Sequence, residues 1–442
     1  MKPKFGSTEV GAFDYEFLRG LMAAGWGGAE LGECLDVARH IRRNGLRSWT
    51  KAWHARARAL AEQADAAERD GRRETAAGLL MRASTYMRMA CFYASYRKPI
   101  HREAWQASRD CFRRSIAISR PDIEVVGIPF GAATLPGYFI RAAAPPRPTL
   151  IALGGFDSTA EEICAWIGFA SPRYGWNCLV FEGPGQWGAV YDNNGLRLMA
   201  DYEQPVGAVV DWLLSQDDVR PDQVALIGYS LGGFLAARAA AFEPRIAAVI
   251  LNPPLADVGE AFQAAWPGVL RDLPPWLFDI AYHLIALHDV QARWALQHAR
   301  WVLGIERPSE LFDAWIPYSL AGTEGHIRCP TLCRITEDEI AQTSTGMIEA
   351  NLHALEHMPA RKRIHLFTRT EGAAAHCQIG GLTIGQATVF DWLNGVFGYA
   401  APVAGLDLPL SFNIALSPVI ERHHGPRAAE RARQMELRAA VE

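Results

Sequence analysis

The sequence predicts an α/β fold in which a mostly parallel sheet is flanked by helices, with a helical domain before the sheet and a helical lid inserted into it. Three observations support this prediction. Helix-forming sequence fills the first part of the chain, strand and helix patterns then alternate, and a stretch rich in tryptophan and proline interrupts the alternation. Alternating strands and helices favour a parallel sheet, because each crossover helix covers a face of the sheet.

The region 1–120 is expected to form a helical cap or dimerisation element. Strong helix formers fill residues 55–68 and 74–90, with almost no turn signals inside them. Apolar and aromatic side chains recur at helical spacing, which predicts a packed helical bundle rather than a cofactor site. These side chains are Trp49, Trp53, Leu60, Leu79, Leu80, Tyr86, Met89 and Tyr93.

The sheet is expected over 121–253 and 327–400, with the lid between them at 254–326. Short apolar runs predict strands at 123–129, 134–141, 149–153, 178–181, 224–227, 246–251, 331–335 and 364–369. Helices are expected at 160–169, 202–216, 231–242 and 384–396. The remaining segment, 401–442, is expected to be a C-terminal tail that ends in a surface helix or a frayed end.

Composition narrows the class of partner. Half of the 442 residues are hydrophobic, 21% are charged, and the formal net charge is only −4. This balance argues against nucleic acid and anionic membranes as partners. Residues 1–15 lack the apolar core of a signal peptide, and no uncharged stretch reaches the roughly 20 residues that span a bilayer. A cytoplasmic location is the resulting expectation.

Eight cysteines are scattered along the chain without the short regular spacings of a disulfide framework or a zinc site. The pair Cys329 and Cys333, in Cys-Pro-Thr-Leu-Cys, is expected to enter a buried strand rather than to bind metal. The turn Gly183-Pro-Gly-Gln186 lacks the lysine of a phosphate-binding loop, so it is expected to line the site. The sequence therefore predicts neither a metal nor a cofactor.

Ser230 is the candidate nucleophile, within Gly228-Tyr229-Ser230-Leu231-Gly232. The pattern Gly-x-Ser-x-Gly is weak evidence alone, but here an apolar strand precedes it and an alanine-rich helix follows it. A strand, a tight turn and a helix form a nucleophile elbow, in which the glycines make room and the turn projects the serine Oγ above the sheet. We therefore expect Ser230 to attack a carbonyl carbon and form an acyl-enzyme.

A serine hydroxyl is a weak nucleophile unless a histidine takes its proton and a carboxylate orients that histidine. His376 is the expected base, because it lies in a loop between the last strand and the last helix of the core. The other histidines considered, His353, His357 and His365, fall within an expected helix or strand and are less well placed.

The expected acid is Asp338, which follows the carboxyl end of a core strand, where α/β folds place functional groups. Its neighbours Glu337 and Glu339 are alternatives, and the two carboxylates not used would form a solvated acidic loop. A carboxylate after the preceding strand, Asp257 or Glu260, is a further alternative.

Two backbone N–H groups are expected to form the oxyanion hole. Leu231 directly follows the nucleophile, and Phe156 lies in the loop Gly154-Gly155-Phe156-Asp157-Ser158 after the strand 149–153. The glycines of this loop would let the backbone approach the oxyanion closely.

Together these motifs resemble a subgroup of the α/β-hydrolase family, the one with 2,6-dihydroxypseudooxynicotine hydrolase and fungal hydrolases that shorten polyketide pigment precursors. The resemblance extends over roughly residues 15 to 397 and includes the paired tryptophans. The matching segments are 154–159, 161–162, 182–186, 228–233 and 371–377. The sequence departs from the pattern at Trp187, where a small residue is common, and at Arg334-Ile335, which replaces His-Gly.

The resemblance implies an α/β-hydrolase fold and assigns the nucleophile to Ser230, the base to His376, the acid to Asp338 and the oxyanion donors to Phe156 and Leu231. It also implies hydrolysis of a carbon–carbon bond next to a carbonyl, as in retro-Claisen cleavage, with esters as substrates of related enzymes. A homodimer through the N-terminal helical region is a further implication.

The functional expectation is therefore a cofactor-free serine hydrolase that acts on a ketone, β-diketone or ester of a small aromatic or polyketide-like metabolite. An acyltransferase or cyclase would use the same residues if the lid kept water from the acyl-enzyme. A non-catalytic binding protein would need a broken triad, whereas nucleophile, base and acid are all available.

Overall fold

The computed structural model describes residues 12–42, 45–400 and 405–441, so parts of the expected regions 1–120 and 401–442 lie outside the described residues. Contacts divide the chain into two compact units. The first contains Met1–Val125 and Asp279–Gly304, and the second contains Val126–Phe278 and Ile305–Glu442. The insertion expected over 254–326 is therefore divided: its middle groups with the N-terminal helices, and its two ends group with the sheet.

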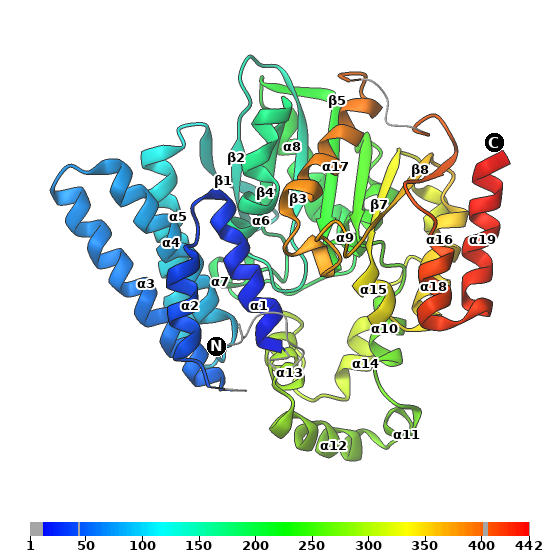
Figure 1. Ribbon diagram of the computed structural model, residues 1–442, viewed down its shortest axis with the longest axis horizontal. Helices are drawn as coiled ribbons and strands as arrows, with labels where there is room; N and C mark the ends of the chain where they lie inside the picture. Colours follow the sequence, from blue (N-terminus) through cyan, green and yellow to red (C-terminus); the bar gives the residue numbers. More distant parts are fainter. Residues whose placement is uncertain (1–11, 43–44, 401–404, 442) are drawn as a thin grey trace. The chain divides into compact units, whose positions relative to one another are not determined.

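The first unit is helical. Its elements are α1 (Ala12–Leu21), η1 (Met22–Trp26), α2 (Leu31–Arg39), α3 (Leu46–Arg69), α4 (Arg73–Phe92), α5 (Pro99–Ser119) and α13 (Val290–Val302), while α12 (Pro275–His288) runs from the second unit into the first (Figure 1). The apolar side chains of α3 recur every three or four residues, so they fall on one face of the helix and are buried.

Aromatic packing joins α3, α4 and α13 within this unit. Trp49 on α3 donates from its indole Nε1 to the Met89 carbonyl oxygen on α4 at 2.6 Å. Trp294 on α13 donates to the Phe92 carbonyl oxygen at 2.9 Å and stacks on the Phe92 ring with 4.7 Å between centroids. The middle of the insertion is thus part of the helical bundle.

The second unit is built on a nine-stranded sheet with the order β1-β2-β4-β3-β5-β6-β7-β8-β9. The strands are β1 (Ile123–Phe130), β2 (Ala133–Ile140), β3 (Arg147–Leu153), β4 (Asn177–Phe181), β5 (Val219–Tyr229), β6 (Ala248–Asn252), β7 (Thr331–Thr336), β8 (Lys362–Phe367) and β9 (Leu410–Phe412). Strands β4, β3, β5, β6, β7, β8 and β9 run parallel, and β2 pairs with β4 antiparallel. The predicted mostly parallel sheet is confirmed.

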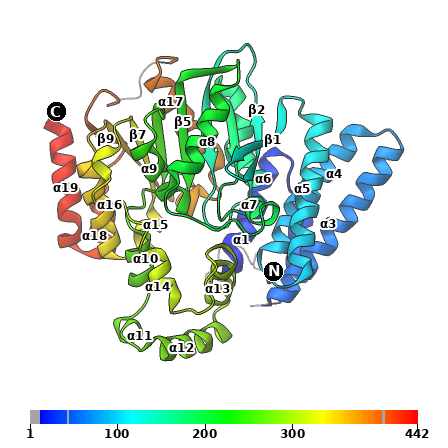
Figure 2. The ribbon, with the colours of Figure 1, turned by 180° about the vertical axis from the view of Figure 1, so that it is seen from behind.

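Helices cover both faces of this sheet. Helix α17 lies in front of the sheet in Figure 1, whereas α8 and α9 lie in front of it in Figure 2. The helices of this unit are α6 (Ala160–Trp166), η2 (Gly168–Tyr174), α7 (Trp187–Asp192), α8 (Glu203–Leu214), α9 (Leu231–Phe242), α10 (Val258–Ala264), α11 (Gly268–Arg271), α14 (Glu310–Trp315), η3 (Glu324–His326), α15 (Glu337–Gln342), α16 (Thr345–His357), η4 (His376–Gln378), α17 (Leu382–Val396), α18 (Ser417–His424) and α19 (Pro426–Val441).

The C-terminal segment is an integrated part of the second unit. Strand β9 adds to the edge of the sheet in parallel with β8, and α19 packs against α16 and α18. Helix α19 buries one stripe of side chains, Ala428, Ala429, Ala432 and Met435. The expectation of a frayed end therefore does not hold for the described part of this segment. Among the described residues, no helix combines the length and the apolar character needed to cross a membrane.

Candidate active site

Ser230 lies at a sharp turn between β5, which ends at Tyr229, and α9, which begins at Leu231. Its backbone has φ +59° and ψ −123°, a conformation that is strained for a residue with a side chain. The turn closes so tightly that a Cβ on Gly228 would lie 1.8 Å from the Gly232 carbonyl oxygen. The strand, turn and helix predicted around Ser230 are thus present, with glycine where a side chain would clash.

His376 reaches the serine from the loop after β8. Its Nε2 lies 3.0 Å from Ser230 Oγ, which is hydrogen-bond distance. A neutral imidazole with its proton on Nδ1 accepts from the serine hydroxyl in this geometry, as a general base must. The other histidines stay where the sequence placed them: His353 on α16, His357 at its end, and His365 within β8.

Glu339, and not Asp338, lies against the histidine. The Glu339 Oε1 atom is 2.6 Å from His376 Nδ1, and its side chain is only 10% exposed. Asp338 instead forms an ion pair with Arg369, whose side chain is 60% exposed. The structure thus corrects the choice of Asp338 as the carboxylate that orients His376, and the alternative Glu339 occupies that position.

The register of α15 explains the correction. Helix α15 begins at Glu337, directly after β7, so successive side chains of its first turn point in directions about 100° apart. Thr336 and Glu339 form a capping box: the Thr336 hydroxyl accepts from Glu339 N at 3.1 Å, and Glu339 Oε2 accepts from Thr336 N at 2.9 Å. One carboxylate oxygen therefore caps the helix while the other faces His376.

The remaining acidic candidates have other partners. Glu337 accepts from the backbone N–H of Arg369 at 2.8 Å. Asp257 caps α10 by accepting from the backbone N–H of Glu260 at 2.6 Å. The pattern Thr-x-x-Glu at 336–339 is the sequence signal of a capping box, and this signal, which the prediction of Asp338 did not use, singles out Glu339.

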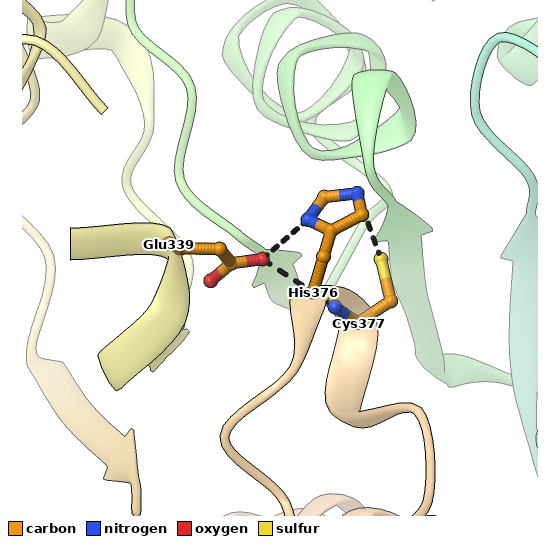
Figure 3. Close-up of side chains that lie close together, drawn as sticks. All are labelled: Glu339, His376 and Cys377. Carbon is orange, nitrogen blue, oxygen red and sulfur yellow. Dashed lines mark hydrogen bonds and ion pairs between the residues drawn. The ribbon is translucent and has the colours of Figure 1, made fainter. Parts of the chain in front are cut away.

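Figure 3 shows Glu339, His376 and Cys377 together. The Cys377 N–H donates to Glu339 Oε1 at 3.4 Å, and the Cys377 sulfur lies 3.5 Å from His376 Nε2. Burial lowers the pKa of His376, but the Cys377 sulfur and the Glu339 carboxylate raise it by more, so its pKa lies above the usual value.

The same three residues are the one group in the described part of the chain whose ligand atoms could hold a metal ion. The 2.6 Å between Nδ1 and Oε1 is a hydrogen-bond distance, however, and an ion between two such ligands at about 2.0 Å from each would need a wider gap. Cys333 lies within β7 and Cys329 two residues before it, which matches the expected entry into a buried strand. The geometry fits a catalytic triad better than a metal centre.

The loop after β3 approaches Ser230 closely. A Cβ on Gly155 would lie 2.8 Å from the Ser230 Cβ and 3.0 Å from the Leu231 nitrogen, so only glycine fits there. Phe156 and Leu231 both line the cavity beside Ser230. The two backbone segments that were expected to supply the oxyanion donors therefore lie side by side at the serine.

A cavity of about 330 Å³ opens at Ser230, Glu339 and His376. This volume is at the lower end of the range for small-molecule sites. Apart from Glu339 and His376 its lining carries no ionisable side chain, and most of the lining is aliphatic. Among the tryptophans of the insertion, Trp315 is the one in this lining, where its ring lies 5.6 Å from that of Phe156.

Comparison with known proteins identifies the family. A model of the alpha/beta hydrolase family matches residues 155–377, which is half of the chain and includes Ser230, Glu339 and His376. The chain belongs to the α/β-hydrolase family.

Three fungal relatives of this α/β-hydrolase extend the match to most of its length. Hydrolase acrC of Aspergillus aculeatus is 32% identical over 414 residues, which cover 87% of this chain and 96% of the relative. Hydrolase LUC6 of Fusarium sp. is 31% identical and 20-hydroxy-prefusarin hydrolase FUS2 of Gibberella moniliformis is 30% identical, with the same coverages. The prediction of a hydrolase related to fungal hydrolases is confirmed.

Among solved structures, the α/β-hydrolase is similar to 2,6-dihydroxy-pseudo-oxynicotine hydrolase, with a TM-score of 0.67 and 21% identity. The similarity covers 88% of this chain and 97% of the other. It supports the predicted fold, including the helical region before the sheet.

Proposed function

We propose that the protein is a serine hydrolase in which Ser230 is the nucleophile, His376 the general base and Glu339 the triad acid. One observation carries the proposal: His376 lies between the other two, with Nε2 at 3.0 Å from Ser230 Oγ and Nδ1 at 2.6 Å from Glu339 Oε1. This is the arrangement by which a histidine accepts a serine proton while a carboxylate fixes its tautomer.

The reaction would proceed in two halves. His376 Nε2 takes the hydroxyl proton as Ser230 Oγ bonds to the carbonyl carbon, and the N–H groups of Phe156 and Leu231 stabilise the resulting oxyanion. The tetrahedral intermediate collapses, the bond to the leaving group breaks, and the His376 proton passes to that group. Water then loses a proton to His376, attacks the acyl carbon and releases a carboxylic acid, and the proton returns to Ser230.

The proposed substrate is an uncharged, largely apolar metabolite that carries a reactive carbonyl, because the aliphatic lining offers no charge partner away from the triad. A ketone or β-diketone cleaved at the carbon–carbon bond is the first candidate, and a carboxylic ester is the second. The leaving group is an enolate in the first case and an alkoxide in the second, so product analysis separates the two.

Active-site labelling tests the proposal. A fluorophosphonate should bond to Ser230 Oγ with loss of fluoride, and peptide mass spectrometry should place the adduct on the peptide that contains Ser230. Ser230→Ala should lose labelling and at least about 10³-fold in kcat, since the rest of the site alone supports only residual catalysis. Full turnover by Ser230→Ala would overturn the proposal.

A further inference from the structure

The C-terminal segment contributes part of the wall of the substrate cavity. Leu416 and Ile420 of this segment line the cavity that opens at Ser230, and both are only 1% exposed. Leu416 directly precedes α18 with helical backbone angles, and Ile420 lies within α18, so these two residues, four apart, point to the same side one turn from each other. Other parts of the lining come from α15 and α16, which follow β7.

Helix α18 is fixed to the helix that carries the triad acid. His424, one further turn along the same face of α18, lies with Nε2 at 2.7 Å from the Ile340 carbonyl oxygen of α15. A carbonyl only accepts, so Nε2 donates, and Nδ1 lies 3.1 Å from the Thr345 hydroxyl, which is hydrogen-bond distance. The Ile340 carbonyl is in the last turn of α15, where helix carbonyls lack partners within the helix.

Helix α19 fixes the other end of α18. Glu436 accepts from Leu416 N at 2.6 Å, from Ser417 N at 2.8 Å and from Ser417 Oγ at 2.6 Å. A carboxylate that bonds to the first N–H groups of a helix also interacts favourably with the helix dipole. Arg431 and Arg438 of α19 in turn pair with Glu356 at the end of α16. The bonds of Glu436 therefore hold α18 and α19 together, while His424 on α18 and the two arginines on α19 attach the hairpin to α15 and α16.

We propose that the hairpin α18–α19 determines substrate specificity, because it places Leu416 and Ile420 where they limit the length of the acyl chain that the cavity accepts. This inference rests on the proposed function, because the acyl group is the part of the substrate that stays bonded to Ser230 while water approaches. An aliphatic chamber that begins at Ser230 suits an unbranched or lightly branched apolar acyl chain.

The dependence of kcat/KM on acyl-chain length tests this proposal. It is measured with p-nitrophenyl esters whose acyl chains have two, four, six, eight and ten carbons. Ile420→Trp fills the chamber and should move the optimum to shorter chains, whereas Ile420→Ala enlarges it and should move the optimum to longer ones. The ratio of the kcat/KM values for eight and four carbons should rise about tenfold or more in Ile420→Ala, since each methylene in a fitted pocket affects binding strongly.

Val419→Ala is the matched control. Val419 is also buried on α18, but it lies outside the cavity lining, so its truncation should leave the chain-length profile unchanged. Labelling of Ser230 by ethyl fluorophosphonate, measured in every variant, reports the proposed function separately. If Ile420→Ala and Ile420→Trp are labelled but keep the natural chain-length profile of kcat/KM, the role of the hairpin in specificity is overturned and the proposed function is not. Absence of labelling in the natural protein overturns the proposed function.

A second inference comes from a different observation, the bonds of Gln186 in the Gly-Pro-Gly-Gln turn. Its side chain is 1% exposed. The amide Nε2 donates to the Gly154 carbonyl oxygen at 2.8 Å and to the Gly155 carbonyl oxygen at 3.3 Å, while Oε1 accepts from Gly183 N at 2.8 Å. Exchanging the amide oxygen and nitrogen would place an acceptor against two carbonyl oxygens and a donor against the Gly183 N–H. The orientation of the amide is therefore determined.

We infer that Gln186 is a positioning residue for the oxyanion hole. The carbonyl of Gly155 and the N–H of Phe156 belong to one planar trans peptide group and point in opposite directions. A donor held on the Gly155 carbonyl therefore sets the direction of the Phe156 N–H. Gln186 acts only through this peptide group and does not contact the reacting atoms in the mechanism above.

Gln186→Leu removes the donor and retains the size of the side chain, and Gln186→Glu replaces the donor by an acceptor. Both should lower kcat by about tenfold to a hundredfold, less than complete loss of an oxyanion donor, while KM stays within about threefold. The inhibition constant of an alkyl trifluoromethyl ketone, which forms a tetrahedral adduct, should rise by the same factor as kcat/KM falls.

Gln386→Leu is the control, because Gln386 donates to the Trp166 carbonyl oxygen at 2.9 Å and does not line the cavity at Ser230. Its kcat should not change. Values of kcat are normalised to the fraction of enzyme that fluorophosphonate titrates. An unchanged kcat in both Gln186 variants, or a decrease that the titrated fraction fully explains, overturns the positioning role.

Discussion

The two turns that carry Ser230 and Glu339, the proposed nucleophile and triad acid, are held in different ways. Backbone contacts hold the turn at Ser230: the carbonyl of Gly232 lies where a Cβ on Gly228 would be. Side-chain hydrogen bonds hold the turn after β7, where Thr336 and Glu339 cap each other. A turn held by backbone contacts has no room for one added Cβ atom. A turn held by side-chain hydrogen bonds can lose one of these bonds and keep the other.

The strongest test of this contrast is Gly228→Ala. The added Cβ, 1.8 Å from a backbone oxygen, should abolish labelling of Ser230 and lower the free energy of unfolding by at least about 3 kcal/mol, at the upper end for overpacking. Gly207→Ala in α8 is the control, because its Cβ would make only an ordinary contact with Glu243 at 3.5 Å. Chemical denaturation measures both. Equal stabilities of the two variants would contradict the backbone-held turn.

Replacement of the acid should have the next largest effect. Glu339→Gln keeps the size of the side chain but has one acceptor oxygen in place of two, and that oxygen is shared between Thr336 N and His376 Nδ1. An NH2 group turned toward His376 favours the wrong tautomer, so kcat/KM should fall by about 10² to 10⁴-fold. Asp338→Asn is the matched neighbour, and should change kcat/KM by less than about threefold, because an exposed ion pair contributes little. A larger loss in Asp338→Asn than in Glu339→Gln would restore the assignment made from sequence.

The pH dependence of kcat/KM tests the contact between Glu339 and His376. Protonated His376 cannot accept the serine proton, so kcat/KM should fall as pH drops through the raised pKa of His376. Glu339→Gln removes a carboxylate that favours the protonated form, and the midpoint of this fall should therefore move to lower pH. Rate measurements between pH 5 and pH 9 locate the midpoint. A midpoint that stays fixed, or that moves upward, contradicts the role of Glu339.

Thr336→Val should have the smallest effect. The substitution keeps the shape of the side chain but removes the hydroxyl that accepts from Glu339 N, while Glu339 Oε2 keeps its bond to the backbone of residue 336. We expect a loss of about 1 kcal/mol in stability, as for other N-caps, and less than a tenfold decrease in kcat/KM. Thermal unfolding and steady-state kinetics measure the two. Complete inactivation would show that the remaining bond from the backbone N–H of residue 336 to Glu339 Oε2 is not enough to hold the turn after β7.

The difference between the turns also explains what could be predicted from sequence. The Ser230 turn depends on glycines and on adjacent strand and helix patterns, all of which are local, so a short stretch of sequence is enough to place it. The choice between Asp338 and Glu339 depends on where α15 begins relative to β7, and a shift of one residue rotates the side chains about 100° around the helix. Hydrophobic periodicity does not fix helix ends so finely.

The C-terminal segment shows a second limit. Alanines and charged residues predict a helix over its last part, but α16, one of the elements that this helix packs against, is distant in sequence. The contribution of Leu416 and Ile420 to the cavity arises from this distant packing. Periodicity can indicate that a helix has an apolar face, and it does not indicate which part of the protein that face covers.

The backbone conformation of Ser230 has a consequence for how the protein can change over time. A non-glycine residue at φ +59° costs on the order of 1–3 kcal/mol, which is a sizeable share of the stability of an ordinary domain. The conformation of Ser230 therefore reduces the margin within which other substitutions can accumulate before the protein unfolds. New substrate preferences are accordingly easier to acquire at a distance from this turn, where a substitution does not add to a strain that is already present.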